Sequence, residues 1–125
     1  MREILFRGKR VDNGEWIEGF YLREAGNFIK ELPSIISTPT HLIIPDTIGQ
    51  YTGLKDKNGK RIFEGDIVKI PFRRDYGVVR YEVPECHFEY VMQGDGDFIE
   101  FNGWASAVEV MGDVYDNPEL LKETE

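Results

Sequence analysis

The chain has 125 residues, 41% of them hydrophobic, and a formal net charge of −8. A chain of this length forms one domain, or two very small ones that share a core. It can bury enough surface to fold without a disulfide or a metal. The single cysteine, Cys86, excludes an internal disulfide and fits a reducing compartment. The sequence shows no signal-peptide pattern and no apolar run of about 18 residues, so we expect a cytoplasmic protein that does not span a membrane.

The charges are divided unevenly along the chain. Residues 1–81 contain 14 Lys and Arg against 11 Asp and Glu, whereas residues 82–125 contain 12 acidic residues against one Lys. An acidic surface often serves solubility alone. The alternative is a molecule with opposite poles, which would favour head-to-tail self-association or contact with a basic partner. The negative net charge disfavours generic nucleic-acid binding, which depends on neutralising phosphates.

The first predicted element is a β-hairpin. Its arms cover residues 4–10 and 16–23, both rich in aromatic or β-branched side chains, with Asn13 and Gly14 at the turn. Asn-Gly is the strongest short hairpin signal, because both turn positions of the tightest hairpins need a positive φ.

The next segment is predicted to be strand followed by loop. Residues 28–31 read as a strand after a turn. Pro33, Pro39 and Pro45 then predict loop and short edge strands, because proline cannot donate a ladder hydrogen bond. Residues 41–44 form a plausible strand within this segment.

The segment 51–70 repeats the hairpin signal at Asn58 and Gly59, with charged residues at its tip. A faint echo links it to the first hairpin, since Gly8, Asn13, Gly14 and Ile17 recur 45 residues later. Duplication of a hairpin unit would explain the echo. Shared turn chemistry, which demands the same few residue types, explains it equally well.

Two-residue alternation predicts strands in the remainder of the chain. Over residues 78–83, one face carries Val79, Tyr81 and Val83, and the other is polar apart from Val78. Further strands are predicted at 87–93, 98–101 and 108–115. Residues 117–122 predict a short helix that begins at Pro118, and the chain as a whole is predicted to be all-β.

The sequence offers no metal site of recognised spacing. One cysteine and two histidines cannot form a Cys/His zinc cage, and Cys86 and His87 are adjacent, so they would point to opposite faces of a strand. Asp95 and Asp97 loosely suggest a calcium loop, but Ile99 stands where the third ligand belongs. We predict no metal and no cofactor.

Catalytic motifs are also missing from the sequence. No serine lies in a Gly-x-Ser-x-Gly elbow, and no phosphate-binding loop precedes a predicted helix. A thiol at Cys86 activated by His87 is a weak alternative to a small buried side chain. We therefore predict a non-enzymatic protein with no catalytic residues.

A basic cluster remains as the candidate contact surface. It comprises Lys55, Lys57, Lys60, Arg61, Arg73 and Arg74. Charged hairpin tips commonly only deter edge-to-edge aggregation. The functional alternative is contact with an acidic patch of another subunit or partner. Aromatic residues that would anchor an interface or fill the core are Trp16, Tyr21, Phe72, Tyr76 and Trp104.

The sequence resembles the YopX-like family of phage and prophage proteins. The resemblance rests on residues 50–60, which read QYTGLKDKNGK, and on residues 62–68, which read IFEGDIV. The segment FRGK at 6–9 and the closing segment at 108–121 also look like the family. Residues 71–107 look like its variable part.

The resemblance implies an uncharacterised protein of bacteriophages and prophages with a mainly β fold. It implies an SH3-like small barrel over 49–116, which follows the antiparallel hairpins predicted over 1–48 and precedes the short helix or tail over 117–125. The two β regions form either separate regions or one compact domain. No catalytic residue is known for the family, and SH3-like barrels serve peptide binding, nucleic-acid binding and assembly alike.

Three functional hypotheses follow. The preferred one is a protein-interaction or assembly module that binds itself as a homo-oligomer and contacts a host or phage protein. The second is a nucleic-acid-associated barrel that uses the basic cluster. The third is an acidic mimic of DNA, built from the residues after 82, that captures a basic host protein.

Overall fold

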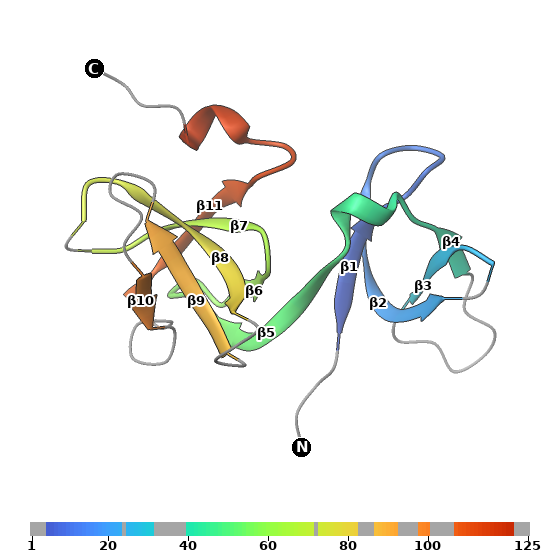
Figure 1. Cartoon of the computed structure of the whole chain (residues 1–125), viewed down its shortest axis with the longest axis horizontal. Coiled ribbons are helices and arrows are strands. Elements are labelled where there is room, and N and C mark those ends of the chain that lie inside the picture. Colours follow the sequence, from blue (N-terminus) through green and yellow to red (C-terminus); the bar gives the residue numbers. More distant parts are fainter. Residues whose placement is uncertain are drawn as a thin grey trace. The chain divides into compact units, whose positions relative to one another are not determined.

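The structure is a computed structural model of the whole chain (Figure 1). It describes residues 5–23, 25–31, 40–71, 73–82, 87–92, 98–100 and 107–121. Contacts divide the chain into two compact units, Met1–Tyr51 and Thr52–Glu125. The regular elements of the described residues are antiparallel strands and 3₁₀ turns, which confirms the all-β class. The predictions made for Pro33, Pro39, Cys86, Asp95 and Asp97 lie outside the described residues.

The first unit is built on an antiparallel sheet in the order β4-β3-β2-β1-β5. Its elements are β1 (Phe6–Lys9), β2 (Trp16–Arg23), β3 (Asn27–Glu31), β4 (Thr40–Leu42), the 3₁₀ turn η1 (Pro45–Thr47) and β5 (Gly49–Lys55). The N-terminal part of β5 pairs with β1, opposite Phe6 and Arg7. The strand then continues into the second unit, where its neighbour is β6 (Arg61–Phe63).

The sheet of the first unit curls back on itself, because β1 also meets the chain just after β4. Arg10 forms an antiparallel bridge with Ile43. The hydroxyl of Thr47 accepts a hydrogen bond from the backbone N–H of Lys9 at 2.9 Å and donates to the carbonyl of Ile44 at 2.6 Å. The first hairpin and the segment after β4 therefore enclose a shared core.

That core consists of the buried side chains Ile17, Ile29 and Ile43, against which Phe6 and Ile48 pack. Ile17 and Ile29 come from β2 and β3, whose alternate residues point inward, and Ile43 directly follows β4. Gly8 lies beside them without room for a side chain. A Cβ added there would lie 2.4 Å from Cγ2 of Ile43.

The second unit contains a five-stranded antiparallel sheet in the order β10-β9-β8-β7-β11. Its strands are β7 (Asp66–Lys69), β8 (Tyr76–Glu82), β9 (His87–Met92), β10 (Phe98–Glu100) and β11 (Glu109–Asp113). The core cluster comprises Ile62, Val68, Ile70, Val79, Phe88, Tyr90, Met92 and Val108. Ile62 brings β6 into this cluster, so the β5–β6 hairpin packs with the sheet.

Both Asn-Gly pairs lie at hairpin turns, but neither turn has the geometry predicted from the sequence. Among the described residues only Ala25 and glycines have a positive φ, so Asn13 and Asn58 do not. The N–H of Gly59 bonds to the carbonyl of Asp56 at 3.0 Å, and Gly59 has a φ of 83°. The turn at Asn58 and Gly59 is therefore a longer hairpin loop, in which a type I turn is followed by a glycine in the left-handed conformation.

Two further predictions need correction. The helix expected over 117–122 is a 3₁₀ turn, η3 (Pro118–Leu121), in which the N–H of Leu120 bonds three residues back to Asn117. On β8, Val78 is buried like Val79, whereas Tyr81 is 41% exposed. The predicted alternation therefore fails at Tyr81.

Candidate functional site

Apolar side chains meet solvent on the outer face of the first unit's sheet. Leu22, Phe28 and Leu42 stand in one row across β2, β3 and β4, because Leu22 is paired with Phe28 and Phe28 with Leu42. Phe20 precedes Leu22 by two residues and shares its face. Phe20, Leu22 and Leu42 are 50%, 40% and 46% exposed. We call these four side chains the apolar face.

Cationic side chains border the apolar face. Lys30 is exposed on β3 and stands opposite Phe20 in the register. Further along the same face, the Trp16 ring lies under Cζ of Arg7 at 4.4 Å and Nζ of Lys9 at 5.2 Å. Both distances fit cation–π contacts, which hold the indole in place.

The charges on this outer face are mostly positive. Arg7 stands opposite Glu18 in the β1–β2 register, and Glu18 is exposed. Arg7 itself is buried, so the cations that this face offers to solvent are Lys9 and Lys30, which share it with Glu18. A complementary partner would be apolar and acidic.

Reasoning from the sequence missed the apolar face. Tyr21 and Phe20 are adjacent, so both faces of β2 look apolar in the sequence. The alternation therefore does not show which face is buried. The structure turns Tyr21 inward, where its ring centroid lies 5.3 Å from that of Phe6 and its hydroxyl donates to Asn27. Among the other candidate aromatic anchors, Trp16 is half-buried between cations, and Phe72 and Trp104 lie outside the described residues.

The basic cluster predicted from the sequence falls in the second unit, at two turns. Lys55, Lys57, Lys60 and Arg61 surround the β5–β6 turn, whereas Arg73 and Arg74 lie in the β7–β8 turn. Nζ of Lys57 lies 3.5 Å from a carboxylate oxygen of Glu109, so its charge is partly neutralised.

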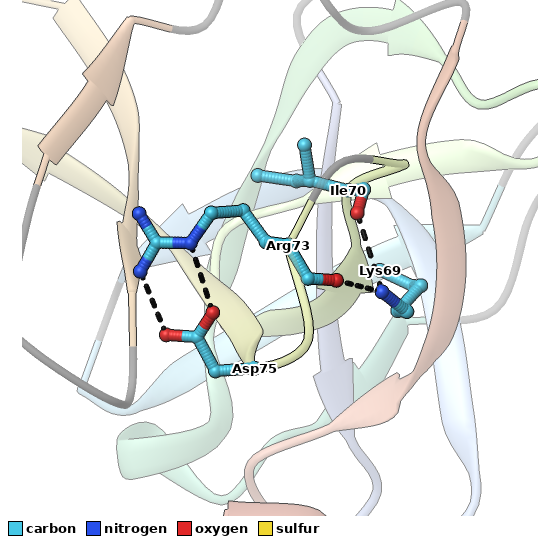
Figure 2. Close-up of polar contacts among 4 residues, drawn as sticks. All are labelled: Lys69, Ile70, Arg73 and Asp75. Atoms are coloured by element: carbon cyan, nitrogen blue, oxygen red, sulfur yellow. Dashed lines mark hydrogen bonds and ion pairs between the residues drawn. The ribbon is translucent and has the colours of Figure 1, made fainter.

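The β7–β8 turn is held by internal contacts. Nε and Nη2 of Arg73 donate to the two carboxylate oxygens of Asp75, each at 3.0 Å, and the two side chains face each other in Figure 2. The ammonium of Lys69 donates to the carbonyls of Arg73 and of Ile70, the latter at 3.3 Å. The charge of Arg73 is therefore used within the turn.

The start of β11 links these two turns. Glu109, the ion-pair partner of Lys57, stands opposite Lys69 in the β7–β11 register. Glu109 at the start of β11 therefore has one cation beside it from each of the two segments, Lys57 by an ion pair and Lys69 by register. The exposed cations of the basic cluster are Lys55, Lys57, Lys60 and Arg74.

Asp56 is a buried carboxylate at the base of the β5–β6 turn. One oxygen accepts the N–H groups of Asn58 and Lys60, each at 2.9 Å, and the other accepts that of Val110 at 2.9 Å. Desolvation by burial would raise the pKa of Asp56, but these backbone donors and the Lys60 charge together hold the pKa below its usual range. The role of this carboxylate is structural.

Within the described ranges, no group of three or more His, Cys, Asp and Glu side chains could hold a metal ion. None of the helical segments in those ranges has the length and apolar character needed to cross a membrane. In the same ranges, the apolar face gathers exposed apolar side chains on one side of a sheet, next to a cationic border.

A known protein structure is similar to this fold. The crystal structure of protein EF1440 from Enterococcus faecalis superposes with a TM-score of 0.60 and 24% sequence identity, over 98% of this chain and 100% of that one. No curated protein matches the chain. The sequence profile of the family described as YopX protein matches residues 5–122. The chain therefore belongs to the YopX family.

Proposed function

We propose that this protein is a non-enzymatic interaction module, an accessory protein of a bacteriophage or prophage that works by binding other protein surfaces. The observation that carries the proposal is the exposure of Phe20, Leu22 and Leu42 on one sheet face. Contiguous exposed apolar side chains with a polar border mark sites of protein contact.

A protein partner suits this face better than a nucleic acid. Phe20 and Lys30 offer a ring and a charge, but Leu22 and Leu42 extend the face across three strands with aliphatic side chains, which neither stack on bases nor contact phosphates. In the basic cluster, Lys57 and Arg73 already face the acids Glu109 and Asp75. The remaining cations lie in a unit whose sequence is acidic overall.

The second unit serves in this proposal as a scaffold of the SH3-like barrel type. Its β6–β7 turn supports that assignment, because Gly65 has a φ of 93° and the buried Asp66 accepts the N–H of Phe63 at 2.7 Å. A Gly-Asp turn of this kind leads into β7. The bonds of Asp56 to the β5–β6 turn and to Val110 join that hairpin to β11, where Val110 lies 54 residues further along the sequence.

The test is site-specific photo-cross-linking in the cell that makes the protein. A photoreactive residue at position 22 would sit on the apolar face, and one at Asn13 would sit on an exposed hairpin tip as the matched control. We expect cross-links to protein from position 22 and few from position 13. Equal labelling from both positions, or cross-links from position 22 to nucleic acid, would contradict the proposal.

A further inference from the structure

We infer that the apolar face binds a second copy of this chain, through an acidic and apolar surface on that copy's second unit. The inference deepens the proposed function and rests on it. The surface comprises Met111, Tyr115, Asp116 and Glu119, and we call it the acidic turn surface. Met111 and Tyr115 are each 40% exposed, and Asp116 and Glu119 are also exposed.

The acidic turn surface begins at an irregularity in β11. The register between β11 and β7 shifts between Val110 and Gly112, which leaves Met111 as the extra residue of a β-bulge. Bulges at sheet edges re-aim a side chain, and here Met111 is directed to solvent. A methionine is well suited to pack on an irregular apolar surface.

The rest of the surface stands on a fixed turn. One carboxylate oxygen of Asp113 accepts the N–H of Tyr115 at 2.9 Å and that of Asp116 at 2.8 Å. The side-chain oxygen of Asn117 accepts the N–H of Asp113 at 3.1 Å and folds over Gly112. These bonds hold the backbone of Tyr115 and Asp116, a few residues after Met111, so this backbone has little conformational entropy left to lose on binding.

The two surfaces are complementary in charge and in apolar character. The apolar face has Lys30 within it and Lys9 at its border, and the acidic turn surface has Asp116 and Glu119 beside two large apolar side chains. Contact between two apolar faces would instead place lysines near lysines, a repulsion that disfavours that pairing. The favoured contact is therefore heterologous, with different surfaces on the two copies.

A mixing experiment tests this arrangement. The first variant, Phe20→Glu, blocks the apolar face, and the second, Met111→Glu, blocks the acidic turn surface. Both side chains are at least 40% exposed, so both variants should keep the fold, which circular dichroism and thermal unfolding would verify. Native mass spectrometry and light scattering then give the association state of each protein alone and of the equimolar mixture.

We expect the wild type to associate and each variant alone to be monomeric. The mixture should form a heterodimer, because the intact acidic turn surface of one chain meets the intact apolar face of the other. A monomeric wild type, a Met111→Glu variant that associates like the wild type, or a mixture that stays monomeric would each overturn the inference.

A charge exchange provides a second, independent measurement. Lys30→Glu and Glu119→Lys should each weaken association by about twofold to fivefold, as expected for exposed charge pairs. The chain that carries both changes should recover affinity, whereas Glu15→Lys, at an exposed acid of the first hairpin, should leave it unchanged. Absence of recovery in the double variant would contradict the pairing.

The two proposals can fail separately. Cross-links from position 22 to another protein, together with a monomeric wild type, would overturn self-association and leave the interaction module intact. Labelling from position 22 no stronger than from position 13 would remove the proposed function itself.

Discussion

Asp56 accepts a hydrogen bond from the backbone N–H of Val110, 54 residues further along the chain, at 2.9 Å. The same carboxylate closes its own turn by accepting the N–H groups of Asn58 and Lys60. A single side chain therefore fixes both the shape of the β5–β6 turn and its attachment to β11.

The first prediction concerns the stability that Asp56 provides. Asp56→Ala leaves three backbone donors without this acceptor, and we expect the free energy of unfolding to fall by about 2–4 kcal/mol. Urea denaturation measures the change. Asp12→Ala is the matched control, because Asp12 bonds to Arg10 at the exposed first hairpin, and it should change stability little. Equal urea midpoints for the two variants would contradict the assigned role of Asp56.

The second prediction concerns the stability of the fold at low pH. The pKa of Asp56 is lower in the folded chain than its ordinary value of 3.8, so the unfolded chain binds the proton more readily. The stabilisation is complete above that ordinary value and is lost as pH falls through the lower folded pKa. The stability difference between wild type and Asp56→Asn should therefore shrink below about pH 4. A difference that stays constant on acidification would show that the carboxylate charge contributes nothing.

The third prediction concerns the close approach at Gly8. Gly8→Ala would place a methyl group 2.4 Å from Cγ2 of Ile43, so we expect a loss of about 1–3 kcal/mol through overpacking. Ile43→Ala removes that methyl group and opens a cavity. The double variant should lose less unfolding free energy than the two single variants lose together, by about 0.5 kcal/mol or more. Strict additivity in thermal unfolding would mean that the two residues do not press on each other.

The fourth prediction concerns the β7–β8 turn. Lys69→Met keeps the side-chain stem but removes the ammonium that bonds to the carbonyls of Ile70 and Arg73. Hydrogen exchange at residues 73–76 should become faster, while exchange in β9 stays as in the wild type. Lys55→Met, at an exposed site on β5, is the control. Unchanged exchange at the turn would show that the ammonium does not order it.

The fifth prediction concerns nucleic acid. We expect no binding of a single-stranded or duplex oligonucleotide at physiological salt, because acids neutralise part of the basic cluster. Fluorescence anisotropy across a salt series provides the measurement. Affinity that falls steeply with salt, and that disappears when Lys55, Lys60 and Arg74 are changed to Glu, would favour the nucleic-acid hypothesis.

The β class and the hairpin positions could be predicted from the sequence, because turn chemistry is local. Glycine tolerates positive φ wherever it occurs, so Gly14 and Gly59 mark the two hairpin turns correctly. Which loop forms around each glycine depends on more distant groups. At Gly59 the choice is made by the Asp56 carboxylate, whose bond to Val110 no local pattern reveals.

The candidate site was harder to predict for a related reason. Phe20, Tyr21 and Leu22 are consecutive apolar residues, and only the three-dimensional core decides which of them are left in solvent. The prediction of a C-terminal helix was wrong because the Asn117 side chain bonds to Asp113 and the next turn closes as 3₁₀. Both outcomes depend on neighbours that sequence periodicity does not identify.

The bond between Asp56 and Val110 also has a consequence for synthesis on the ribosome. The pairings of β1 with β2, of β2 with β3 and of β3 with β4 lie within Met1–Tyr51, so this sheet can assemble while the rest of the chain is still being made. The attachment of the β5–β6 hairpin to β11 must wait until Val110 has left the exit tunnel, because one oxygen of Asp56 bonds within the turn and the other bonds to Val110. Long-range closure of this kind slows folding, so we expect the second unit to complete its fold after the first.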